Sequence, residues 1–134
     1  MSAAPRVGVL ALVCLENRVL LVERGKPPNR GLWGFPGGKL EAGERLRAGA
    51  ARELKEETGI TADFFEALPP LEAISEGFHY ILIPVLGRNP QGLLMAADDA
   101  ADARWLSRAD LADVPHIAEV PPLFDLVLNR LGTP

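Results

Sequence analysis

Hydrophobic and polar positions divide the chain into strand-like and helix-like stretches. Residues 6–15 and 18–24 are rich in valine and leucine and are separated by the short turn ENR, so they predict two antiparallel strands. Residues 78–87 and 103–107 predict two further strands. Residues 62–75 predict an interrupted or edge strand, because Pro69 and Pro70 fall inside this stretch.

Two stretches predict helices. The first begins near Gly43–Glu44 and ends at Gly59, which suits a left-handed C-terminal cap; its apolar stripe is Leu46, Ala50 and Leu54. The second is the closing stretch 121–132, with proline at its start. Residues 108–113 predict a short helix or turn, and the Pro- and Gly-rich stretch 25–38 predicts a loop without regular structure. Hairpins mixed with helices predict an α+β fold, a mixed β-sheet with helices on its faces.

Length and composition narrow the class of protein. With 134 residues, residues 1–134 are expected to form a single domain, and 48% hydrophobic residues indicate a globular chain. The net charge of −4 disfavours a nucleic acid duplex as partner. The apolar stretch VGVLALVCL is interpreted as a strand and not as a signal peptide, and no stretch is long enough to span a membrane. Cys14, the single cysteine, suits a reducing compartment, so a cytoplasmic protein is expected.

Three glutamates gather at the end of the first predicted helix. Glu53, Glu56 and Glu57 fall within an arc of roughly 100° on one helix face. A solvated acidic face is the commoner explanation of such a helix, yet Glu53 and Glu57 are like charges at i and i+4, which repel each other. A divalent cation would relieve this repulsion, and oxygen-only ligands suit Mg²⁺ or Mn²⁺. The pattern therefore favours phosphate-ester chemistry.

The same helix carries a specific motif that resembles the Nudix box. The stretch GKLEAGERLRAGAARELKEETGI, residues 38–60, fills every defining position of that 23-residue signature. These positions are Gly38, Glu44, Arg52, Glu53, Leu54, Glu56, Glu57, Gly59 and Ile60. The resemblance implies the Nudix-type α/β/α sandwich and an enzyme that hydrolyses a nucleoside diphosphate linked to another moiety, with Mg²⁺ or Mn²⁺ as cofactor.

The resemblance also implies roles for individual residues. Glu53, Glu56 and Glu57 would hold the metal together with the carbonyl of Gly37. Arg52 would orient one of these carboxylates, and Glu53 would serve as general base. Some relatives use an acid from a later loop instead, and here the acidic stretch 97–102 offers Asp98, Asp99 and Asp102. Asp99 and Asp102 are the better candidates, although an acidic surface loop is an equally common role for each.

Two substrates and one non-enzymatic role remain open. The stretch VERGKPPNRGLWGFPGGKLEAGE resembles small bacterial Nudix proteins that act as ADP-ribose pyrophosphatases, which favours cleavage of ADP-ribose to AMP and ribose 5-phosphate. The alternative is a MutT-type hydrolase of 8-oxo-dGTP or other dNTPs. There an asparagine reads the oxidised guanine, and Phe124 stands at the matching position here. A Nudix-fold ligand-binding module is the third possibility, disfavoured because no box glutamate is missing.

The remaining candidates are substrate contacts. Arg24, expected at the mouth of the site, and Lys39, beside the glycines, are candidates for phosphate binding. Trp33 is a candidate for base stacking, weighed against loop packing. His79 is a candidate ligand contact, although a hydrogen-bonded structural histidine is commoner. Phe124 is a candidate to stack or pack on a base. The expected partner is a nucleotide or nucleotide sugar, and both a monomer and a homodimer agree with the sequence.

Overall fold

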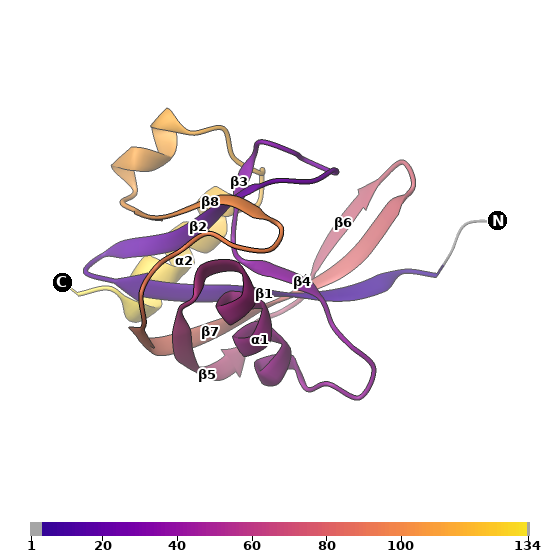
Figure 1. Ribbon diagram of the computed structural model, residues 1–134, viewed down its shortest axis with the longest axis horizontal. Helices are drawn as coiled ribbons and strands as arrows, with labels where there is room; N and C mark the ends of the chain where they lie inside the picture. The colour runs from indigo at the N-terminus through magenta and orange to yellow at the C-terminus, as the bar shows by residue number, and fades with distance from the viewer. Residues whose placement is uncertain (1–3, 134) are drawn as a thin grey trace.

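The computed structural model describes residues 4–133 and contains two layers of helix around a mixed sheet (Figure 1). The strands are β1 (Arg6–Leu15), β2 (Arg18–Arg24), β3 (Trp33–Gly34), β4 (Gly37–Lys39), β5 (Thr61–Ala67), β6 (Leu71–Ser75), β7 (Phe78–Gln91) and β8 (Ala100–Leu106). The helices are α1 (Leu46–Thr58), the 3₁₀ helix η1 (Ala109–Asp113) and α2 (Val120–Leu131). None of the helices in residues 4–133 is long and apolar enough to cross a membrane.

The sheet follows the order β3-β2-β1-β7-β5, with β4 on β1, β6 on β7 and β8 on β2. Strands β1 and β7 pair in parallel and the other pairs are antiparallel, so the predicted mixed sheet is confirmed. On its other side β1 changes partner: Gly8–Leu10 pairs with β4, whereas Cys14 and Leu15 pair with β2. The turn between β1 and β2 places Glu16 and Asn17 at positive φ, which suits a tight hairpin.

Side chains alternate along each strand and therefore cover both faces of the sheet. Each face is buried against a helix. Val9, Ala11 and Val13 of β1 pack with Ala50 and Leu54 of α1. On the opposite face, Leu12 of β1 packs with residues of α2, among them Phe124 and Val127. Figure 1 shows α1 in front of the strands and α2 behind them. The predicted α/β/α sandwich is therefore confirmed.

The boundaries of the first predicted helix are partly right. Gly59 ends α1 with φ of 75°, and its N–H bonds to the carbonyl of Lys55, as the glycine predicted. The helix begins at Leu46 and not at Gly43–Glu44. Glu44 instead accepts hydrogen bonds from the N–H of Glu41 and from the guanidinium of Arg52, so its carboxylate stabilises the loop that leads into the helix.

The expectation that residues 25–38 lack regular structure is wrong in two places. Trp33 and Gly34 pair with Val22 and Glu23, and Gly37 begins β4, which pairs with β1. Both strands are very short, so hydrophobic periodicity has too few residues to reveal them. They nonetheless fix the course of the loop, because their pairing satisfies backbone groups that would otherwise be buried without partners.

Two predicted base contacts belong to the core. Phe124 has no exposed surface and Trp33 is 4% exposed, both in the cluster between the sheet and α2. The guanidinium of Arg104 covers the Trp33 ring at 5.2 Å from its centroid. Neither ring offers a face to a ligand, so base stacking by Trp33 and Phe124 is corrected to core packing.

The position of Phe124 gives a prediction for stability. Truncation of this side chain in Phe124→Ala leaves a cavity between α2 and the sheet and should cost about 3–5 kcal/mol of unfolding free energy, whereas Phe124→Leu should cost clearly less. Urea unfolding followed by circular dichroism measures both values. Equal, near-zero losses for the two variants would contradict the assignment of Phe124 to the core.

Candidate active site

Helix α1 presents two buried carboxylates toward the sheet. Glu53 and Glu57 are 8% and 6% exposed and stand one turn apart on the same face. Leu54 and Ala50 on the adjoining face are fully buried against β1 and β7, which fixes the helix in this orientation. The packing of these apolar residues therefore places two ionisable side chains at buried positions, which uncharged residues usually occupy.

The glycines before the helix make room for these carboxylates. A Cβ atom on Gly38 would lie 2.6 Å from both carboxylate oxygens of Glu53, and one on Gly37 would lie 2.1 Å from the carbonyl oxygen of Val9. The N–H of Gly37 donates to Oε1 of Glu57 at 3.4 Å. Glycine is thus required at position 37 because the backbone of β1 approaches closely, and at position 38 because the Glu53 carboxylate does. Neither requirement comes from an unusual φ angle.

Burial shifts the protonation of both carboxylates. The pKa of Glu57 is raised to about 8, chiefly because burial disfavours its charged form and secondly because of the charge on Glu53. The pKa of Glu53 is also raised, again by burial first, while the hydrogen bond from Arg52 opposes the rise. The positive charges of neighbouring residues therefore do not compensate the charges of Glu53 and Glu57.

Arg52 joins the loop to the helix. Its guanidinium donates to both oxygens of Glu44 at 2.8 and 2.9 Å, to Glu53 Oε1 at 3.1 Å and to the carbonyl of Lys39 at 3.0 Å. These hydrogen bonds hold the pKa of Glu44 down at about 2 and raise that of Arg52. The hydrogen bond to Glu53 agrees with the orienting role predicted for Arg52, which stays a prediction.

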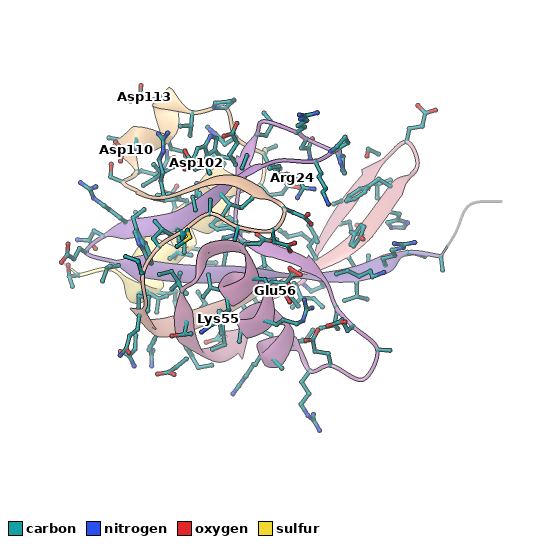
Figure 2. All side chains as sticks on the ribbon, in the orientation of Figure 1. Arg24, Lys55, Glu56, Asp102, Asp110 and Asp113 are labelled. Carbon is teal, nitrogen blue, oxygen red and sulfur yellow. The ribbon has the colours of Figure 1, made fainter. Side chains whose placement is uncertain are left out.

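The third box glutamate faces outward. The side chain of Glu56 is 44% exposed and accepts a 3.4 Å hydrogen bond from Arg52. Figure 2 shows Glu56 on α1 and Arg24 above it in the view. Its charge raises the pKa of Glu53, so it belongs to the same electrostatic group.

The acidic stretch after β7 reaches the site by backbone hydrogen bonds. The N–H of Ala97 donates to the carbonyl of Glu57 at 3.0 Å, and the N–H of Gly25 donates to the carbonyl of Asp99 at 3.0 Å. The Asp99 carboxylate forms an ion pair with Lys26 at 2.8 Å. Both Asp98 and Asp99 lie near enough for their charges to raise the pKa values of the buried glutamates.

Asp102 does not take part, which corrects its prediction as a late-loop acid. It lies on β8 opposite Glu23, and its carboxylate pairs with Arg104 at 2.9 Å and accepts from the N–H of Ala103. Figure 2 places it beside β8, away from Glu56 on α1. Strand alternation after the loop directs Asp102 away from the carboxylates, whereas Asp99 precedes the strand.

A cavity of about 450 Å³ connects α1 with the start of α2. Its lining includes Glu53 and Glu57, together with the cationic side chains Arg24, Lys26 and Lys39. Leu82, Phe78 and Tyr80 of β7 and Ile117 and Glu119 before α2 also line it. A cavity whose lining combines carboxylates, cations and aromatic rings suits a ligand with both a charged part and a flat apolar part.

The cavity sorts the predicted substrate contacts. Arg24, Lys39 and Asp99 line it, although Arg24 Nε also donates to the carbonyl of Pro28 at 2.8 Å. His79 does not line it: its neighbours Phe78 and Tyr80 do, and alternation along β7 directs the His79 ring to the opposite face. Its role as a ligand contact is corrected to a position in the sheet.

Sequence reasoning missed Phe78, Tyr80 and Glu119 as cavity residues. The spacing of two residues between Phe78 and Tyr80 was a usable signal, because it places both rings on one face of the strand. Glu119 gave no such signal, since its place at the cavity depends on how the segment before α2 packs. That segment is held by hydrogen bonds between Trp33 and both Pro115 and Ile117.

The donor set fits a hard divalent cation. Within residues 4–133 no group of three or more His, Cys, Asp or Glu side chains is arranged to hold a metal ion. Magnesium, however, is commonly bound by one or two carboxylates and completes its shell with water and substrate phosphates. Glu53 and Glu57 supply two such carboxylates, and a cation between them would offset their repulsion. The predicted ligand roles of Glu56 and Gly37 stay predictions.

The fold and the site together define a Nudix domain. The NUDIX domain family matches residues 4–126, and the chain belongs to this family. It is 32% identical over 123 residues to an ADP-ribose pyrophosphatase of Methanocaldococcus jannaschii, covering 85% of this chain and 67% of that protein. It is 49% identical over 126 residues to the uncharacterized Nudix hydrolase YvcI of Bacillus subtilis, covering 87% of this chain and 75% of that one.

A solved structure supports the same family. The bifunctional NMN adenylyltransferase/ADP ribose pyrophosphatase of Francisella tularensis superposes with a TM-score of 0.79 at 26% identity, covering 97% of this chain and 42% of that one. A second structure of that protein contains AMP and a manganese ion. For this domain the predicted class, a Nudix pyrophosphohydrolase, is confirmed by its family; substrate and cofactor are proposals.

The two glycines give contrasting predictions. In Gly38→Ala the three atoms nearest the new methyl group all belong to the Glu53 carboxylate, which can move, so the protein should fold while turnover falls by about 100-fold. In Gly37→Ala the methyl group meets backbone, so the thermal midpoint should fall markedly. Thermal melts and turnover of both variants measure this. Full activity in Gly38→Ala would contradict the required position of Glu53.

Proposed function

We propose that this protein is a Mg²⁺- or Mn²⁺-dependent hydrolase of the pyrophosphate linkage in a nucleoside diphosphate derivative, and that ADP-ribose is its substrate, giving AMP and ribose 5-phosphate. The observation that carries the proposal is the pair of buried carboxyl groups, Glu53 and Glu57, in the lining of the cavity. Burial and mutual repulsion oppose ionisation of both groups, a cation would allow it, and a cation with open positions binds phosphate oxygens.

The chain's own residues supply binding and proton transfer. Glu53 and Glu57 would hold the cation, which when bound would lower the pKa of water and neutralise phosphate charge. Glu53, which accepts a 3.1 Å hydrogen bond from Arg52, would accept the proton of the attacking water. Arg24 and Lys39, which also line the cavity, would bind phosphate oxygens and oppose the charge of the carboxylates.

The choice of ADP-ribose rests on shape and on relatives. The cavity lining combines aromatic rings, which suit a base, with carboxylates and cations, which suit a metal-bound diphosphate. The relatives from Methanocaldococcus jannaschii and Francisella tularensis are described as ADP-ribose pyrophosphatases. The MutT-type alternative loses its predicted base contact, because Phe124 is buried in the core.

A product assay with matched variants tests the proposal. The wild-type protein with Mg²⁺ should convert ADP-ribose to AMP and ribose 5-phosphate, as followed by chromatography, and should leave the dNTPs and 8-oxo-dGTP intact. Glu57→Gln should lower turnover by at least about 100-fold, since it removes one of two anionic oxygen donors for the cation. Removal of the metal with a chelator should abolish turnover in the wild type.

Glu66→Gln is the matched control. Glu66 lies on β5, is exposed and pairs with Arg130, so the same change of charge there should leave turnover intact. Release of pyrophosphate from a triphosphate would instead assign the protein to the MutT-type alternative. Full activity in Glu57→Gln would overturn the role of the buried pair, and tight binding of ADP-ribose without turnover would favour a binding module.

A further inference from the structure

Arg6 and Lys39 are cavity residues whose positive charges are not compensated by a carboxylate. Both line the cavity of the candidate active site. Lys26, which also lines it, forms an ion pair with Asp99, whereas no ion pair within residues 4–133 includes Arg6 or Lys39. In the proposed function Lys39 binds the diphosphate, which leaves Arg6 without a role. An unpaired guanidinium in a ligand cavity suits an anionic group of the ligand.

The pairing of β1 places these two cations in order along the strand. Lys39 follows Gly38, the glycine that makes room for the Glu53 carboxylate, and it pairs with Gly8. Arg6 lies two residues before Gly8 and therefore about 7 Å further from Gly38 along the strand. Residues two apart share one face of a strand, so Arg6 lies on the same face as Gly8. Lys39 is thus the cation nearer to the carboxylates, and Arg6 is the more distant one.

An aromatic ring lies beside both positions. Tyr80 pairs with Arg6 across the parallel strands β1 and β7, and its Cδ2 atom is 3.3 Å from the place that a Cβ on Gly8 would occupy. The Tyr80 ring stacks on Phe78 with centroids 4.7 Å apart, and both residues line the cavity. The aromatic surface therefore has Lys39 beside it at one position and Arg6 at another. This arrangement suits a nucleoside that carries anionic groups at two positions.

We propose that Arg6 binds a second phosphate group of the substrate, a phosphate monoester on the ribose of its adenosine, and that the protein therefore prefers an ADP-ribose with this phosphate to ADP-ribose itself. The inference rests on the proposed function, in which the ligand is a nucleoside diphosphate derivative. With the diphosphate beside Lys39 and the base on the ring of Tyr80, the ribose hydroxyls are the groups of the nucleoside that reach Arg6. A guanidinium matches phosphate oxygens with two parallel hydrogen bonds. A phosphate on the 2′- or on the 3′-hydroxyl provides the same chemistry.

Binding of three nucleotides that differ by one phosphate tests the inference. AMP, adenosine 2′,5′-bisphosphate and adenosine 3′,5′-bisphosphate are each titrated calorimetrically into the Mg²⁺-loaded protein. The wild type should bind one of the bisphosphates about 10- to 100-fold more tightly than AMP, the range of one hydrogen bond between charged groups. The bisphosphate that binds more tightly identifies which ribose hydroxyl carries the phosphate.

Substitutions of Arg6 distinguish a specific contact from a general attraction between charges. Arg6→Gln removes the guanidinium and should lose most of the preference for the bisphosphate. Arg6→Lys keeps the charge but not the planar pair of donors, so it should show an intermediate preference. Arg47→Gln is the matched control: Arg47 is exposed on α1 and does not line the cavity, so the same change in net charge there should leave the preference intact.

Several results would overturn the proposal. They are equal binding of AMP and both bisphosphates by the wild type, binding of none of the three, and an undiminished preference in Arg6→Gln. An equal loss of preference in Arg47→Gln would also overturn it, because the effect would then come from net charge alone. Thermal melts check that the variants fold, and Arg6→Lys serves if Arg6→Gln does not fold.

The experiment separates this inference from the proposed function, because it measures affinity and involves no hydrolysis. A preference for a bisphosphate that Arg6→Gln loses, in a protein that does not cleave ADP-ribose, would support recognition of the second phosphate and overturn the proposed reaction. Cleavage of ADP-ribose together with equal binding of AMP and both bisphosphates would do the reverse.

Discussion

The burial of two neighbouring carboxyl groups against a pair of glycines is the constraint on which the rest of the site depends. Glu53 and Glu57 stand where apolar packing of α1 forces them, and Gly37 and Gly38 leave them the room. Burial raises the pKa of both groups, which shows how unfavourable two negative charges are at this place. The proposed cation would relieve this cost by allowing both groups to ionise.

The residues around Glu53 and Glu57 hold these side chains in position but do not neutralise their charge. Arg52 donates one hydrogen bond to Glu53 and two to Glu44, so it stabilises the loop that leads into α1 as well as the Glu53 carboxylate. The backbone bonds from Ala97 to Glu57 and from Gly25 to Asp99 bring an acidic segment close by. Acidic side chains therefore gather in the lining of the cavity, and in the proposed function a metal ion would offset their charge toward a phosphate ligand.

The fold and the box could be predicted from the sequence, whereas the contribution of the segment before α2 to the cavity could not. The β1–β2 hairpin and the cap at Gly59 follow from local patterns, and the fixed spacing from Gly38 to Ile60 identifies the family. The positions of Trp33, His79, Asp102 and Phe124 depend on which face of an element is covered, and local chemistry alone left a structural and a functional role open for each of them. Glu119 reaches the cavity only because the segment before α2 packs on β3.

Calorimetric titration of the metal-free protein with Mn²⁺ at pH 7, in two buffers of different ionisation enthalpy, tests the central claim most directly. With its pKa raised to about 8, Glu57 is mostly protonated at this pH, and it must lose its proton to bind a cation. The account predicts binding with release of nearly one proton per protein, and far less release in Glu57→Gln. Absence of binding, or the same proton release from wild type and variant, would contradict it.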